Sequence, residues 1–61
     1  MKRLEFLKHL KKHNCVILRE GSNHTIYINL LNNKQSTVGR HTELSNLLCK
    51  KVCKQLEIPE I

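Results

Sequence analysis

The sequence predicts a small α+β domain in which two helices cover one face of a three-stranded antiparallel sheet, in the order α-β-β-β-α. Three observations lead to this prediction. Apolar residues recur at helical spacing near both ends of the chain, whereas they alternate with polar residues in the middle. Glycine or asparagine residues separate these segments. With 61 residues, the chain is expected to form one domain that spans residues 1–61.

The first helix is expected from Lys2 to about Asn14, because asparagine can adopt the left-handed conformation that ends a helix. Its buried side is expected to carry Leu4, Phe6, Leu7 and Leu10. The next segment, Cys15–Leu18, is short, apolar and partly β-branched. This composition predicts a strand that is covered on at least one side.

A turn is predicted at Glu20–Asn23, because its glycine permits a positive φ and its serine and asparagine can bond nearby backbone amides. The alternating segment His24–Leu30 predicts a central strand with two different faces. A second turn at Asn32–Asn33 leads to a short polar strand, Lys34–Val38, which is expected at the edge of the sheet. Gly39 ends this strand.

The second helix is expected to begin after Thr42, a good N-cap residue, and to run to about Leu56. Glu43 would then place a negative charge at the positive end of the helix. The buried stripe is expected to comprise Leu44, Leu47, Leu48, Val52 and Leu56. Double-stranded-RNA-binding domains are built in this order of elements, and the charge of the chain agrees with that fold.

The chain carries 11 Lys and Arg residues against 5 acidic residues, all of them Glu, for a formal net charge of +6. This excess indicates a polyanionic partner, either a nucleic acid or an acidic protein surface. Two-metal nucleases and phosphatases hold their ions with clustered carboxylates. The five glutamates are spread along the chain, so a carboxylate-bound metal centre is not expected. A chain of 61 residues also has no room for a separate cofactor module, so no cofactor is expected.

Three cysteines without a CxxC pair fit the reduced thiols of a cytoplasmic protein better than a disulfide framework. The longest apolar run, Cys15–Leu18, is far shorter than the roughly 20 residues that cross a bilayer, so no membrane association is expected. Cys49 and Cys53 lie on one side of the second helix, and a metal site there would need further ligands such as His41. Small buried apolar side chains are the favoured interpretation.

His24 is the strongest candidate for chemistry, because it opens the central strand directly after a turn. Alternation places it on the side of Ile26 and Ile28, at the rim of the core. A histidine that titrates near neutral pH is the usual acid–base group. A strand-end histidine bonded to a turn carbonyl is an equal alternative. His9 and His13 are expected to be surface residues rather than metal ligands.

Arg40 and His41 form a candidate phosphate site together with the free amides of the second helix, with an exposed pre-helix position as the alternative for His41. The other candidate phosphate ligands are Lys34, Lys8 and Lys12. With one Tyr, one Phe and no Trp, the chain lacks a platform for stacking bases, and only Tyr27 is available on the sheet. If the partner is a nucleic acid, contacts mainly to its sugar–phosphate backbone are therefore expected.

Three segments together resemble the HicA toxin family of type II toxin–antitoxin modules. They are Arg19–Tyr27, Thr37–His41 and a Leu/Lys-rich helix that ends in Leu56–Pro59. The Gly-Ser-Asn-His-x-x-Tyr portion is the most specific part. The resemblance implies a double-stranded-RNA-binding-like fold, ribonuclease activity against mRNA, and a HicB antitoxin that covers the active site. It maps the catalytic histidine of the family onto His24.

The sequence departs from the family pattern at two positions. Asn23 lengthens the commoner Gly-Ser-His turn by one residue, and Gly39 stands where the family often has proline before Arg-His. The turn that presents the histidine is thus shaped by Gly21, Ser22 and Asn23.

We therefore expect a metal-independent endoribonuclease that cleaves mRNA and inhibits translation and growth. His24 is the expected general base or acid, with Tyr27 and His41 as candidate supporting residues. The expected partners are RNA and a HicB-type antitoxin. The alternative is a non-catalytic RNA-binding module with the same fold, which would bind RNA by its shape without cleaving it.

Overall fold

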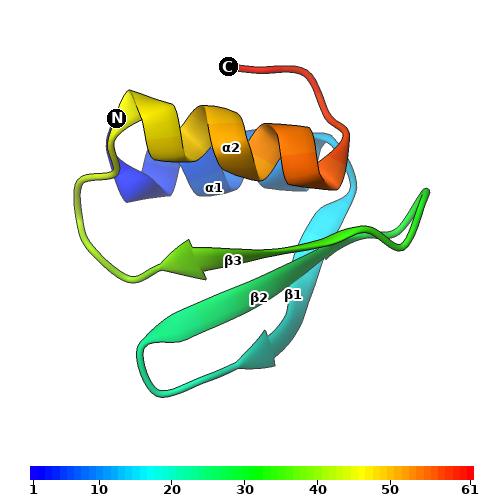
Figure 1. Ribbon diagram of the computed structural model, residues 1–61, viewed down its shortest axis with the longest axis horizontal. Coiled ribbons are helices and arrows are strands. Elements are labelled where there is room, and N and C mark those ends of the chain that lie inside the picture. Colours follow the sequence, from blue (N-terminus) through cyan, green and yellow to red (C-terminus); the bar gives the residue numbers. More distant parts are fainter.

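The computed structural model describes all 61 residues and confirms the predicted order of elements. The elements are α1 (Arg3–Lys12), β1 (Cys15–Glu20), β2 (His24–Asn29), β3 (Gln35–Gly39) and α2 (Asn46–Leu56). The strands form one antiparallel sheet in the order β1-β2-β3. Both helices lie on the same side of this sheet (Figure 1), so the fold has two layers, as predicted. Neither helix is long and apolar enough to cross a membrane.

The central strand β2 determines which side chains enter the core. Thr25, Tyr27 and Asn29 face the helices, with exposed fractions of only 1%, 6% and 3%. Ile26 and Ile28 lie on the open face of the sheet and are half-buried. The alternation of β2 was predicted correctly, but the expectation that its isoleucine side borders the core is wrong.

Hydrogen bonds explain why polar residues of the sheet face the helices. The Thr25 hydroxyl donates to Glu20 Oε1 at 2.6 Å. Asn29 Nδ2 donates to the Leu56 carbonyl at 2.9 Å, and Asn29 Oδ1 accepts from the Leu31 amide at 2.9 Å. Every buried side-chain nitrogen and oxygen has a partner. A buried polar group that keeps its hydrogen bonds avoids the cost of losing water, so it can occupy a core position.

Ten buried apolar residues form the core between the sheet and the helices, and Phe6, Leu10 and Leu56 are completely buried within it. Leu4 and Leu47 were predicted to be buried but are 72% and 67% exposed. Each lies two positions before the first buried residue of its helix. Two positions correspond to a rotation of about 200° around the helix axis, so both leucines point away from the core.

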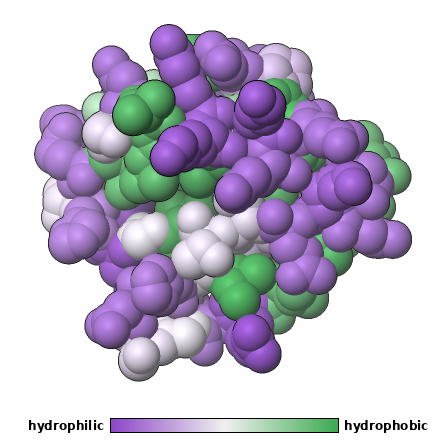
Figure 2. Space-filling model, viewed as in Figure 1, coloured by the Kyte–Doolittle hydropathy of each residue, from purple (hydrophilic) through white to green (hydrophobic).

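Figure 2 shows hydrophilic side chains over most of one face of the molecule, with apolar patches between them.

The first half of the chain follows the sequence prediction closely. Asn14 has a φ of 66° and lies in the left-handed region just after α1, as predicted. Strand β1 continues beyond the predicted Leu18 to Glu20, with a bulge between Ile17 and Arg19. Only the first residue of β1 is buried, so this edge strand is covered less than expected.

The segment before α2 pairs with the N-terminus of the chain and does not start a helix. The Arg3 amide donates to the Thr42 carbonyl at 2.8 Å, and the Leu44 amide donates to the Met1 carbonyl at 2.8 Å. These bonds flank an isolated antiparallel bridge between Lys2 and Glu43. The predictions that Thr42 caps the second helix and that Glu43 lies in its first turn are therefore wrong.

Helix α2 begins at Asn46, and Ser45 is its N-cap residue. The Ser45 hydroxyl accepts a hydrogen bond from the Leu48 amide at 3.1 Å. This bond satisfies one of the amides that have no partner within the helix. The free amides of this helix therefore do not adjoin His41, which removes one part of the predicted phosphate site.

The cap assignment predicts the effect of two matched substitutions. Ser45→Ala removes the acceptor of the Leu48 amide and should lower the free energy of unfolding by about 1 kcal/mol. Thr42→Ala is the control and should change it by less than about 0.5 kcal/mol, because Thr42 pairs through its backbone carbonyl. Urea unfolding followed by circular dichroism measures both variants. Equal losses of stability would contradict the assignment.

Burial raises the pKa of the Cys15, Cys49 and Cys53 thiols and of the Tyr27 phenol above their ordinary values. The folded protein therefore favours the neutral forms of these groups more than the unfolded chain does. The neutral thiols and phenol contribute fully to the free energy of unfolding below the pKa of an unfolded thiol, which is about 8.5. This contribution is lost as the pH rises through the higher pKa values of the folded state.

The free energy of unfolding is accordingly expected to decrease between about pH 8 and pH 10. Removing one thiol should make the decrease shallower, so Cys53→Ala should lose less stability than the wild type over the same interval. Urea unfolding at several pH values measures both slopes. A free energy of unfolding that stays constant up to pH 10, or equal slopes for the two proteins, would contradict this account.

Candidate active site

Two segments far apart in the sequence meet at one end of the sheet. His24, the exposed first residue of β2, pairs with Gly39, the last residue of β3. Arg40 and His41 follow Gly39 directly, so the register of β2 and β3 brings them beside the turn that precedes His24. A polar depression of about 370 Å³ at this end is lined by Ser22, Asn23, Arg40 and His41.

The side chain of His24 belongs to the open face of the sheet. Alternation along β2 puts it on the side of Ile26, as predicted, whereas Thr25 faces the helices. His24 therefore stands outside the core and is accessible to a large ligand that lies on the open face.

The His41 ring lies beside Gly39, the residue that pairs with His24. A Cβ atom placed on Gly39 would lie 3.7 Å from Cδ2 of the His41 ring. Paired residues of antiparallel strands project to the same face, so a Cβ atom on Gly39 would point in the same direction as that of His24. Both imidazoles therefore lie on the open side, at the same end of the sheet.

The turn before His24 is closed by a short backbone hydrogen bond. The Gly21 amide donates to the His24 carbonyl at 2.7 Å. Gly21 does not have a positive φ, so the predicted reason for a glycine here is wrong. A Cβ atom on Gly21 would lie 3.2 Å from the His24 carbonyl oxygen, which is closer than ordinary contact. Glycine is favoured at this position because the two backbone segments approach so closely.

Arg40, predicted as a phosphate ligand, lies against this turn and donates to several of its acceptors. Its Nη2 donates to Glu20 Oε1 at 2.9 Å and to the Gly21 carbonyl at 2.5 Å. Its Nη1 donates to the Ser22 carbonyl at 3.4 Å. The His24 carbonyl is a further acceptor, 3.5 Å from Nη2. The guanidinium thus bonds the turn that carries the candidate catalytic histidine.

Glu20 holds its charge in this network. The hydrogen bond from the Thr25 hydroxyl is the main cause that lowers the pKa of the Glu20 carboxyl below its ordinary value, and the charge of Arg40 lowers it further. Glu20 is therefore an anionic partner for the Arg40 guanidinium at neutral pH.

Two arginines that the sequence did not assign to a site lie at or near this end of the sheet. Arg3 Nε donates to the Gly39 carbonyl at 3.0 Å. Arg19 is exposed and pairs with Ile26, so its side chain lies on the same open face as that of His24. Neither position has a local sequence signal. The position of Arg3 depends on the pairing of the N-terminus with the segment before α2. The face on which the Arg19 side chain lies depends on the bulge in β1.

The other predicted site residues lie elsewhere. Tyr27 is buried and faces the helices, on the side of the sheet opposite to His24. Lys34 precedes β3 at the far end of the β2–β3 hairpin, about 17 Å from His24 by the rise of a strand. Lys8 and Lys12 are exposed on α1, in the helix layer. The structure therefore brings His24, Arg40 and His41 together and leaves these four residues apart from them.

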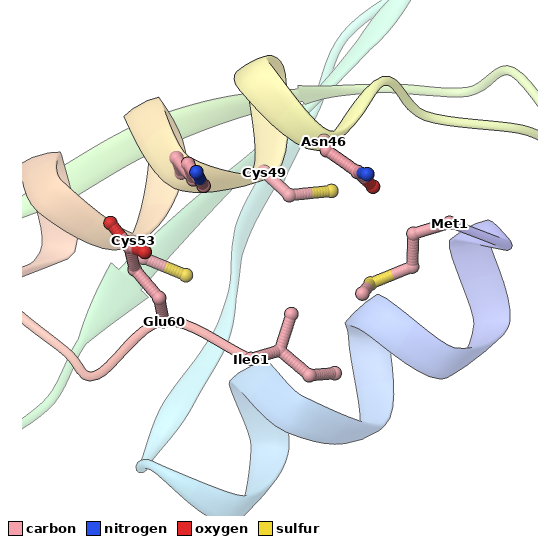
Figure 3. Close-up of a pocket in the computed structure, with 7 residues that line it drawn as sticks. Met1, Asn46, Cys49, Cys53, Glu60 and Ile61 are labelled. Atoms are coloured by element: carbon pink, nitrogen blue, oxygen red, sulfur yellow. The ribbon is translucent and has the colours of Figure 1, made fainter.

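A second cavity, of about 270 Å³, lies in the helix layer between α2 and the two ends of the chain (Figure 3). Cys49 and Cys53 point into it from α2, opposite Met1 and Ile61. His41 is not among the residues that line it, and no group of three or more His, Cys, Asp and Glu side chains is placed to hold a metal ion. The arrangement gives no support to a metal-stabilised domain built on these two cysteines and His41.

The family profile described as the HicA toxin of bacterial toxin–antitoxin systems matches residues 4–58 of the chain. The chain gave no match among the curated proteins or among the solved structures. The matched segment contains all three strands, the turn before His24 and the whole of α2. On this match over nearly the entire sequence, the chain belongs to the HicA family of toxins from bacterial toxin–antitoxin systems.

Proposed function

We propose that this toxin is a metal-independent endoribonuclease that cleaves mRNA in the cytoplasm and thereby inhibits translation and growth. The observation that carries the proposal is the pair of imidazoles on one open face, His24 at the start of β2 and His41 beside Gly39. Two histidines at one end of an open sheet provide the groups that acid–base cleavage of RNA requires.

The chemistry follows from RNA itself, which supplies the nucleophile. His24 accepts the proton of a ribose 2′-hydroxyl, and the 2′-oxygen attacks the adjacent phosphorus. The bond from phosphorus to the 5′-oxygen of the next nucleotide breaks, and His41 donates a proton to that oxygen. The products are a 2′,3′-cyclic phosphate and a free 5′-hydroxyl. Positive charge around the phosphate stabilises the developing negative charge.

The basic residues divide into a group near the histidines and a group farther away. Arg19 lies on the same open face as His24 and contributes charge where the phosphate reacts, and Arg3 adds charge from the helix layer through its contact with the Gly39 carbonyl. Lys34, Lys8 and Lys12 contact phosphates farther along a bound strand in this proposal. Contacts to the backbone suffice for such binding, since Tyr27, the sole aromatic residue of the sheet, is buried and cannot stack a base.

The partner of this toxin in its toxin–antitoxin system is, in our proposal, a HicB-type antitoxin with an acidic surface. The net charge of +6 gives such a surface the same electrostatic attraction that it gives RNA. A partner that binds the folded toxin also stabilises it by mass action, which matters for a domain of 61 residues. Binding over the open face would keep RNA from His24.

A second candidate function is a non-catalytic module that binds structured RNA. The fold order and the lysines far from His24 favour it, because they do not depend on any reaction. This module would bind RNA with strong salt dependence but leave it intact. Cleavage of RNA by the purified protein distinguishes the two functions.

His24→Ala should reduce cleavage of single-stranded RNA in EDTA by about 10²- to 10⁴-fold, because it removes the group that takes the proton of the 2′-hydroxyl. His41→Ala should also reduce the rate, because it removes the group that protonates the departing 5′-oxygen. His13→Ala is the control, because His13 lies at the end of α1 and should leave the rate unchanged. Rates come from single-turnover cleavage of a labelled RNA, and toxicity comes from growth after expression without an antitoxin.

Three results would contradict the proposal. They are equal rates for the wild type and His24→Ala, cleavage that appears only after a metal ion is added, and equal growth arrest by both proteins. RNA binding without cleavage by the wild type would instead establish the second candidate function.

A further inference from the structure

We infer that Arg40 is a positioning residue that holds the turn before His24 in place, and that it is not a direct phosphate ligand. We call the contacts of Arg40 with this turn the clamp. The clamp is a structural statement, so the inference rests on the proposed function only for its activity readout. It assigns to Arg40 a different role from the phosphate contact that the sequence predicts.

The contacts of Arg40 join the ends of all three strands. Arg40 follows β3, its Nη2 donates to the carboxylate of Glu20 at the end of β1, and the same atom reaches the carbonyl of His24 at the start of β2. The carbonyls of Gly21 and Ser22 between these strands accept further hydrogen bonds from the guanidinium. A planar guanidinium with five N–H groups can serve several acceptors at once, which a lysine ammonium cannot do with the same geometry.

The turn needs such a restraint because nothing in the core holds it. Gly21, Ser22 and Asn23 are all exposed, and none of them belongs to a strand. The backbone hydrogen bond from Gly21 to His24 closes the turn, and the Arg40 contacts lie around the same carbonyl. The orientation of His24 therefore depends on groups that Arg40 fixes.

The clamp is anchored on a buried side chain. Thr25 is 1% exposed and donates to Glu20 Oε1 at 2.6 Å. The same carboxylate oxygen accepts from Arg40 at 2.9 Å. The core thus positions Glu20, Glu20 positions Arg40, and Arg40 positions the turn.

These contacts also make Arg40 a poor phosphate ligand. Its Nη2 is directed to Glu20 and Gly21, so a phosphate could use this nitrogen only after displacing the turn. Glu20, a carboxylate 2.9 Å away, offsets the charge that would attract the phosphate. The Arg40 side chain is 41% exposed, which is compatible with a residue on the surface of the turn.

Arg40→Lys tests the inference most directly, since it keeps the charge and loses the planar guanidinium. The first readout is hydrogen exchange of the Gly21 amide by NMR, which needs no activity. Exchange at Gly21 should accelerate by at least about tenfold, while amides of the central sheet such as Tyr27 keep their protection. Glu20→Gln should act in the same direction, because it weakens the anchor of the clamp. Lys51→Ala, an exposed substitution on α2, is the control and should leave Gly21 unchanged.

Kinetics on RNA supply the second readout. For Arg40→Lys we expect kcat to fall by about 10- to 100-fold, with KM and the salt dependence of RNA binding close to those of the wild type. A direct phosphate ligand would behave differently. Arg40→Lys would then keep most of kcat, and Arg40→Ala would raise KM and reduce the salt slope by about 0.7 for the lost contact. Glu20→Gln would then tighten RNA binding, because it frees Arg40.

The two proposals can fail separately. Unchanged exchange at Gly21 in Arg40→Lys would overturn the clamp, whatever the kinetics show. Accelerated exchange with an unchanged kcat would overturn the positioning role. A wild-type protein that cleaves no RNA would overturn the proposed nuclease function, and the exchange of Gly21 would still decide whether Arg40 holds the turn.

Discussion

Strand β2 is hydrogen-bonded on both sides, and its alternation divides the molecule into an inner and an outer face. A shift of one residue in its register would turn His24 toward the helices and bring Tyr27 to the surface. The hydrogen bond from Asn29 to the last carbonyl of α2 opposes such a shift, because a buried amide without a partner is costly. The contact that fastens the sheet to α2 therefore also keeps the candidate catalytic histidine on the open face.

The sequence predicted the existence and order of every element, because periodicity and turn residues are local properties. It could not predict which face of β2 is inside. By hydropathy the isoleucines belong in the core, but Asn29 is satisfied there by a carbonyl 27 residues away. The start of α2 was missed for a similar reason. The Met1 ammonium donates to the Leu44 carbonyl at 2.9 Å, across 43 positions, and this pairing delays the helix until Ser45 can cap it.

The candidate site shows the same division between local and distant causes. His24 could be singled out because a turn followed by a strand is visible in the sequence. The environment of Arg40 could not be predicted, since its acceptors lie 16 to 20 positions earlier in the chain. Tyr27 was a reasonable candidate by its distance in sequence from His24. An odd separation along a strand places two side chains on opposite faces, so Tyr27 is buried toward the helices and cannot contact a ligand on the open face.

A two-layer domain of this size has no third layer to cover the outer face of its sheet. Val16, Ile26 and Ile28 consequently remain at least partly exposed on the same face of the sheet as His24. Stability thus depends on the inner side chains, whereas the proposed chemistry depends on the outer ones. The two meet at Thr25, whose buried hydroxyl holds Glu20 and, through it, Arg40. A change in the packing around Thr25 can therefore alter the turn before His24, because one hydrogen bond joins Thr25 to Glu20 and a second joins Arg40 to Glu20.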